Sequence, residues 1–205
     1  MGPYLVICVI AGLVVFIPTD GFAYYYSSET KWDISGLEEI PVVIMTSSDI
    51  SSKTISHVKE VVLSEQSYNI EGSVSFFGWN GIIENMNHWG NGFLFPKLKI
   101  SETGERKNAI VIFLSSIKDP HGHDGKTNLI LDENKIVGAI ITVYESDKLT
   151  KSQITNIVRH ELGHALGLRH CDNPDELMYE FITPDKFLTG HEGYHLVILY
   201  LTSQI

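Results

Sequence analysis

The segment 160–170, near the C-terminal end of the chain, reads HELGHALGLRH. Its first two histidines, His160 and His164, are four residues apart, so on an α-helix their side chains share one face. Two imidazoles placed in this way can converge on one Zn²⁺ ion, with each nitrogen ~2.0–2.1 Å from the metal. Glu161 lies next to His160 but is rotated off the pair, so its carboxylate can reach a metal-bound water without ligating the ion. The spacing therefore predicts a catalytic zinc site carried by a helix.

The third histidine of the segment cannot follow on the same helical face, because Leu168 occupies the next position there. Gly167 allows the helix to end before the third histidine, since glycine readily adopts the left-handed conformation that ends a helix and turns the chain. The turn would bring His170 back toward the metal from outside the helix. Three protein ligands leave a fourth position open for water, which is typical of catalytic rather than structural zinc sites.

Such a site implies hydrolysis. Zinc lowers the pKa of its water to about 7 and polarises a scissile carbonyl. Glu161 would be the general base that takes the water's proton and passes it to the leaving amine. We therefore expect a zinc-dependent endopeptidase that hydrolyses peptide bonds of proteins. The alternative from another class is a non-catalytic binding protein that zinc stabilises.

A second H-E-x-x-H pattern occurs at His191 to His195. The glycine and histidine that follow the first copy are missing here, where Ile198 and Leu201 stand, and no later glutamate precedes the end of the chain. We interpret this copy as a coincidence on a surface-facing helix, with an accessory metal as the alternative. The full pattern at 160–170 is much rarer than H-E-x-x-H alone, so only the first copy supports a catalytic site.

Hydrophobic periodicity predicts the elements that must position this site. A stripe of apolar residues predicts a helix over 150–168, with Thr150 or Ser152 as its cap. Gly, Asn and Trp without a clear period suggest an irregular insertion over 78–96, with a helical turn near 82–86. The remaining expected elements are strands at 40–45, 73–77, 109–114 and 138–144, and helices at 51–66 and 192–201. This order indicates a mixed α/β fold with the motif near its C-terminal end.

The composition fits one globular domain. The chain has 205 residues, of which 43% are hydrophobic and 20% charged, which is ordinary for a folded domain with its own core. The formal net charge of −10 argues against a nucleic-acid partner, which would favour a basic face. We expect a monomer that acts on a protein or peptide substrate.

The N-terminal residues 4–17 are apolar and uncharged and end at Pro18. This run is shorter than the ~20 residues of a membrane span but suits the apolar part of a signal peptide, with cleavage after Ala23. No Lys or Arg precedes Lys31, so an uncleaved membrane anchor and a buried strand or helix stay as alternatives. We expect a secreted or extracytoplasmic protein that consists of a signal peptide or anchor (1–23), a linker (24–39) and a catalytic domain (40–205).

The stretch 158–179 resembles the metzincin metallopeptidases, and within them the matrixins, in its histidine motif, short acidic loop and Leu177-Met178-Tyr179. The resemblance implies that Met178 forms a Met-turn, packed beneath the metal without ligating it. It also implies a metzincin-type fold, a twisted mixed sheet packed on helices. The strand at 138–144 would then be the edge that pairs with an extended substrate.

The chain also departs from the matrixin pattern. The linker 24–39 has no cysteine that could cap the zinc in a zymogen. The loop with His121, His123 and Asp124 matches part of a second, structural zinc site of matrixins, but the strand at 138–144 has no histidine. We therefore expect one catalytic zinc ion, and a second structural zinc or calcium ion has no further support.

The archaemetzincins are a more distant alternative, because Cys171 directly follows the third histidine as in their pattern. A further cysteine would be expected where Glu176 stands, and no late C-x-x-C follows. Cys8 lies in the expected signal peptide, so Cys171 would be alone in the mature chain and is expected to be a small buried residue. The alternative function under this resemblance is a zinc aminopeptidase.

Overall fold

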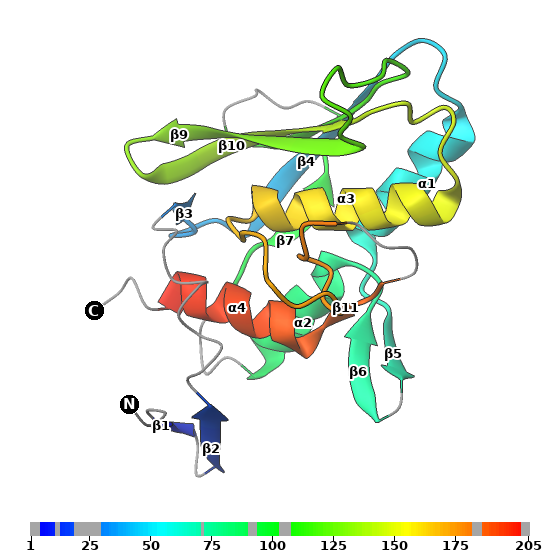
Figure 1. Ribbon diagram of the computed structural model, residues 1–205. Helices are drawn as coiled ribbons and strands as arrows, with labels where there is room; N and C mark the ends of the chain where they lie inside the picture. Colours follow the sequence, from blue (N-terminus) through cyan, green and yellow to red (C-terminus); the bar gives the residue numbers. More distant parts are fainter. Residues whose placement is uncertain are drawn as a thin grey trace.

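A six-stranded, mainly parallel sheet forms the upper layer of the molecule (Figure 1). The computed structural model describes residues 5–10, 13–18, 30–70, 72–89, 94–102, 108–181 and 186–201. The parallel strands, in spatial order, are β3 (Lys31–Trp32), β10 (Lys135–Val143), β8 (Ile110–Leu114), β4 (Glu39–Thr46) and β7 (Lys97–Ile100). One antiparallel strand, β9 (Gly125–Asp132), pairs with β10. The predicted strands at 40–45, 109–114 and 138–144 are therefore present.

Helices α1 (Ser52–Leu63) and α3 (Lys151–Ala165) lie beneath this sheet, and α2 (Trp79–Trp89) and α4 (Gly190–Leu201) lie below them (Figure 1). Ser51 caps α1, since its side chain accepts a hydrogen bond from the backbone N–H of Thr54. The interior faces of β4, β8 and β10 are fully buried, as Ile40, Ile112 and Ile141 show. The predicted mixed α/β fold is confirmed.

Helix α2 corrects the prediction of an irregular insertion over 78–96. Trp79, Ile82, Ile83 and Met86 recur at helical spacing, and all are buried. The indole N–H of Trp79 donates to the carbonyl of Arg159 in α3 at 2.7 Å. Glycine and asparagine disfavour a helix in isolation, but burial of this apolar face stabilises it here, because tertiary packing outweighs intrinsic propensity.

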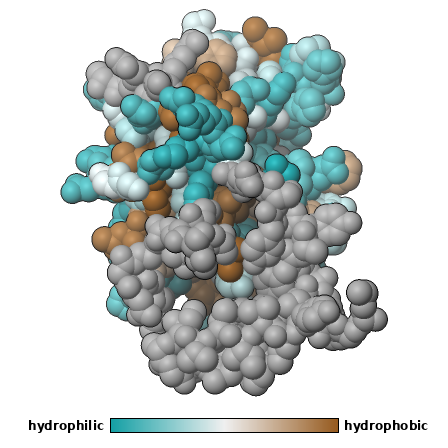
Figure 2. Space-filling view, turned by 90° about the vertical axis from the view of Figure 1, so that its left-hand side faces the viewer, coloured by the Kyte–Doolittle hydropathy of each residue, from teal (hydrophilic) through white to brown (hydrophobic). Residues whose placement is uncertain are grey.

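The prediction that 138–144 is a free edge strand is wrong, because β10 lies between β8 and β9. Among the described strands, β9 pairs with β10 alone and forms the edge on this side. Figure 2 faces the end of the molecule where β9 turns into β10, and its described surface is mainly hydrophilic with scattered hydrophobic side chains. Strand β9 contributes side chains of both kinds, since Lys126 and Asn128 are exposed and so are Leu129 and Leu131.

A small second sheet lies at the other end of the molecule. It contains β5 (Ser67–Ile70), β6 (Ser73–Phe76) and β11 (Leu188–Thr189), paired antiparallel in the order β11-β6-β5. The predicted strand at 73–77 corresponds to β6, whereas β5 and β11 were not expected. Because β11 leads directly into α4, this sheet fixes the start of the C-terminal helix.

The N-terminal region contains the hairpin β1 (Leu5–Ile10) and β2 (Leu13–Pro18), paired antiparallel. The expected cleavage site at Ala23 and the first part of the expected linker lie outside the described residues. Later in that linker, β3 pairs with β10, and Trp32 is buried in the core, so the folded unit reaches back to residue 31. No helix in the described part of the chain is long and apolar enough to cross a membrane. The signal peptide stays a prediction.

Candidate metal centre

Helix α3 carries the first H-E-x-x-H motif and has well-defined ends. At its start, Thr150 and Gln153 form a capping box in which each side chain accepts a hydrogen bond from the other residue's backbone N–H. This satisfies donors that the first turn of a helix leaves without partners. The predicted cap at Thr150 is therefore present, and α3 is fixed in the core by a nearly continuous run of buried residues.

The end of α3 turns the chain as predicted. Gly167 has φ = 99°, a left-handed conformation that favours glycine. Its N–H donates to the carbonyl of His164, and the N–H of Leu168 donates to the carbonyl of Gly163, both at 2.9 Å. This pair of bonds is the Schellman motif, and it reverses the chain so that His170 lies over the last turn of the helix.

The three predicted histidines come together at this turn. The Nε2 atom of His160 lies 3.1 Å from that of His164 and 3.2 Å from that of His170, and the Nε2 atoms of His164 and His170 are 3.1 Å apart. Nitrogens bound to one tetrahedral zinc ion at ~2.0–2.1 Å would be about 3.3–3.4 Å from one another. The three rings thus converge at the spacing of ligands to a single ion.

His160 and His164 are also in the neutral form that a metal ion binds. Nδ1 of His160 lies 2.8 Å from the carbonyl oxygen of Leu177, and Nδ1 of His164 lies 2.9 Å from that of Leu168. A carbonyl only accepts, so each Nδ1 carries the proton and each Nε2 presents a lone pair. Burial, the largest cause, lowers the pKa of both histidines to about 4, so both are neutral at pH 7. Facing lone pairs at 3.1 Å repel one another unless a positive ion lies between them.

Glu161 lies on the same helix and is buried. The hydroxyl of Thr127 in β9 lies 2.6 Å from its Oε2 and 3.0 Å from its backbone carbonyl oxygen. Burial raises the pKa of Glu161 to about 7, while the hydrogen bond from Thr127 and the nearby His123 act in the opposite direction. A carboxylate with a pKa near the working pH is suited to proton transfer. Thr127 has no signal in the sequence, because its role depends on the pairing of β9 with β10.

These side chains open onto one cleft of about 550 Å³. It is lined by residues 122–127, from the loop before β9 and the first part of that strand, and by Glu180 and Phe181. The histidine cluster and Glu161 also line it. The cleft is therefore bordered by the edge strand of the sheet, where an extended chain could lie.

Comparison with known proteins places this arrangement in a family. The matrixin model of peptidase family M10 matches residues 82–192, more than half of the chain, and the match includes most of α2, the sheet edge, α3 and the start of α4. The chain belongs to the matrixin family. Zinc is the metal expected of a matrixin, and membership supports zinc-dependent proteolysis in general.

Individual relatives resemble only part of the chain. A probable matrix metalloproteinase of Invertebrate iridescent virus 3 is 43% identical over 51 residues, which are 25% of this chain and 14% of that protein. Macrophage metalloelastase of Rattus norvegicus is 40% identical over 60 residues, 26% of this chain and 13% of that protein. The chain thus spans about one seventh of the length of these relatives. A solved structure, the hatching-enzyme zinc protease HCE-1 of Oryzias latipes, aligns with TM-score 0.36 and 16% identity over 71% of this chain and 52% of the other.

In this matrixin Met178 packs against Gly163 of α3, the residue before His164. It is 1% exposed, and its carbonyl accepts a hydrogen bond from the N–H of Cys171. Cys171 is buried too, and its thiol contacts the carbonyl oxygen of Asn173 at 3.6 Å. Burial and the charge of Glu176 raise the pKa of Cys171 to about 12, so it is an inert thiol at neutral pH.

Gly163 lets α3 approach the Met-turn closely. A Cβ atom at this position would collide with Sδ of Met178 and lie 2.9 Å from the ring of Trp79. We expect Gly163→Ala to lower the free energy of unfolding by about 1–3 kcal/mol, as overpacking of a core does, although alanine ordinarily stabilises a helix interior. Denaturant unfolding of the metal-free protein measures this change.

Gly190, in the first turn of α4, is the matched control. A Cβ atom there would meet nothing within 4 Å, so Gly190→Ala should leave stability unchanged or raise it. Equal stability of the Gly163→Ala protein and the wild type would show that the Met-turn is not packed against α3 as described.

The loop that matches part of the second zinc site of matrixins is organised around Asp119. Oδ2 of Asp119 accepts hydrogen bonds from Nδ1 of His123 at 2.7 Å and from the backbone N–H groups of His121 and His123. Among the described residues, the groups that could hold a metal include neither His121, His123 nor Asp124. Asp119 therefore orders this loop at the rim of the cleft.

Proposed function

We propose that this matrixin is a zinc-dependent endopeptidase in which His160, His164 and His170 hold the metal and Glu161 is the general base. The convergence of three Nε2 atoms within 3.1–3.2 Å of one another carries this proposal. The first two rings are also neutral and oriented by backbone carbonyls through Nδ1. These are the properties of zinc-binding imidazoles.

Bound zinc supplies a Lewis acid that polarises a carbonyl and makes water a stronger nucleophile. The residues of this chain supply proton transfer and orientation. Glu161 accepts the proton of the attacking water and returns it to the amine that leaves. Thr127 holds one oxygen of that carboxylate at 2.6 Å, so the other oxygen, Oε1, is the one we assign to proton transfer.

We propose that an extended segment of the substrate binds along the edge strand, so that an internal peptide bond reaches the metal. The cleft is bordered by the first part of β9, which pairs with β10 alone among the described strands. An edge strand offers backbone groups along which an extended substrate can add. Residues 125–127 of β9, rather than the interior strand β10, are therefore the part of the sheet that we propose to bind substrate.

Cleavage of casein and of peptides with blocked or free N-termini tests the proposal. An endopeptidase should cleave casein and the blocked peptides, and a chelator should abolish both activities. Cleavage of free-amine peptides alone would indicate an aminopeptidase, and binding of zinc without cleavage would indicate a non-catalytic protein. Export from the cytoplasm is part of the proposal and is supported by the apolar residues 4–17.

Thr127 gives the proposal a pH-dependent test. Its hydrogen bond lowers the pKa of Glu161, so Thr127→Val should raise that pKa. Because the base must be ionised to act, the acid limb of the kcat/KM profile should move to higher pH, with a larger loss at pH 6 than at pH 8.5. A pH–rate profile measures the shift.

Thr127→Ser keeps a hydroxyl and is the matched control, which should retain the wild-type profile. An equal loss at every pH in the valine variant would mean that Thr127 only packs against α3 and does not tune the carboxylate.

A further inference from the structure

The second H-E-x-x-H copy brings its two histidines to a carboxylate from another part of the chain. His191 and His195 lie on one face of α4, with ring centroids 4.5 Å apart. Nδ1 of His191 lies 2.7 Å from Oε1 of Glu176, which belongs to the loop before the Met-turn. The ligand atoms of these three residues all lie within 4.8 Å of one another.

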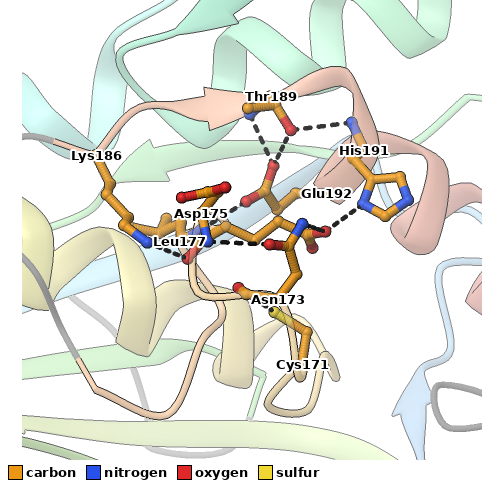
Figure 3. Close-up of polar contacts among 9 residues, drawn as sticks. Cys171, Asn173, Asp175, Leu177, Lys186, Thr189, His191 and Glu192 are labelled. Atoms are coloured by element: carbon orange, nitrogen blue, oxygen red, sulfur yellow. Dashed lines mark hydrogen bonds and ion pairs between the residues drawn. The ribbon is translucent and has the colours of Figure 1, made fainter. Parts of the chain in front are cut away.

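Glu192, the glutamate of this motif, has a different task. Its Oε1 accepts a hydrogen bond from the N–H of Leu177 at 2.8 Å, and its Oε2 accepts from the N–H of Thr189 at 2.8 Å and from the Thr189 hydroxyl at 2.5 Å. Figure 3 shows the Glu192 side chain directed at Thr189 and Leu177, whereas the His191 ring is joined to a different carboxylate, that of Glu176. Glu192 therefore caps α4 and is not placed as a catalytic base.

The surroundings of the three side chains favour a cation. Glu176 is 5% exposed and His195 7% exposed, while His191 lies at the surface. A buried carboxylate is costly unless positive charge or hydrogen bonds compensate it. A cation bound between these three side chains would supply that positive charge.

The orientation of Glu176 is fixed by its neighbours. The amide of Asn173 donates to Oε1 of Glu176 at 2.9 Å, and Lys186 donates to the Glu176 backbone carbonyl at 3.3 Å. The bond from Leu177 to Glu192 anchors the next residue to α4. Such support from groups around a ligand is typical of metal sites.

We propose that Glu176, His191 and His195 form a second, structural site for Zn²⁺, separate from the histidine cluster on α3. Two imidazoles and a carboxylate are a donor set that zinc accepts, and the exposed side of His191 leaves room for water or a further donor. The site joins the loop before Met178 to the first turns of α4.

This second ion would also support the first site. Leu177 follows Glu176 directly, and its carbonyl accepts the hydrogen bond from Nδ1 of His160. A metal on Glu176 therefore fixes the peptide that orients one histidine of the α3 cluster. The α4 cluster would bind its ion whether or not the α3 cluster is catalytic.

Zinc titration of the metal-stripped full chain, with metal analysis after dialysis, tests the proposal. We expect two zinc ions per chain in the wild type and one in each of His191→Ala, Glu176→Gln and His164→Ala, whereas His164→Ala/His191→Ala should bind none. His191 is half exposed, so its replacement should not prevent folding, and Glu176→Gln preserves shape. His88→Ala, at an exposed histidine of α2, is the matched control and should bind two.

A thermal measurement isolates the second site. In His164→Ala, zinc at about a hundredfold excess over its dissociation constant should raise Tm by roughly 5–10 °C, and His191→Ala added to this variant should abolish the rise. One zinc in the wild type with none in His164→Ala would overturn the second site and leave the proposed function intact. One zinc ion in both the wild type and His164→Ala, together with none in His191→Ala, would support the second site and refute the ligands proposed on α3.

Discussion

Glu161→Gln should reduce kcat/KM by about 10²–10⁴-fold, the typical contribution of a positioned general base, while the zinc content stays at the wild-type level. Glutamine has nearly the same shape and can still accept the hydrogen bond from Thr127, but it cannot take a proton from water. Peptide cleavage and metal analysis of the same preparation measure both quantities.

The matched control for this change is Glu38→Gln, which alters an exposed glutamate outside the cleft and should keep full activity. Activity of Glu161→Gln within about threefold of the wild type would refute the assignment of the base. A loss of zinc together with activity would mean that Glu161 acts as a ligand.

His164→Ala should lose both the zinc of the α3 cluster and nearly all activity. It removes one of three nitrogens that lie 3.1–3.2 Å apart, and two remaining imidazoles hold zinc poorly. Loss of a hydrogen-bond partner behind a ligand already weakens metal affinity about 10–100-fold, so we expect loss of the ligand itself to cost more. Competition with a chromophoric zinc chelator measures the affinity.

His88→Ala serves again as the control, since it removes an exposed imidazole from α2 and should change neither affinity nor activity. Circular dichroism separates the loss of a ligand from unfolding, because the His164→Ala protein should keep its helical signal. Wild-type zinc affinity and activity in His164→Ala would contradict the proposed site.

Much of the metal centre could be predicted from the sequence because its determinants are local. The four-residue spacing of His160 and His164 fixes their common face once α3 forms, and the capping residue Thr150 marks where the helix begins. Gly167 predicts the turn because a left-handed residue after a helix is a property of two or three neighbouring residues. Its φ of 99° agrees with that prediction.

The errors arose where tertiary contacts decide the structure. Helix α2 forms because Trp79 and its apolar neighbours are buried against the rest of the core. The local sequence of residues 78–96 does not predict this burial. The sequence predicted 138–144 as the edge strand, but β9 forms the edge, because strand order depends on pairing between distant segments. Thr127 became a partner of Glu161 for the same reason.

The two H-E-x-x-H copies show which features follow from local sequence and which depend on the tertiary structure. The sequence by itself determined that each pair of histidines shares a helix face, since four-residue spacing on a helix is local geometry. Only the tertiary structure decided what else reaches each pair. His170 joins the first pair through a local turn, whereas Glu176 reaches the second from 15 residues away. Glu161 opens onto the cleft while Glu192 binds Leu177 and Thr189, because the direction and surroundings of a side chain depend on long-range packing.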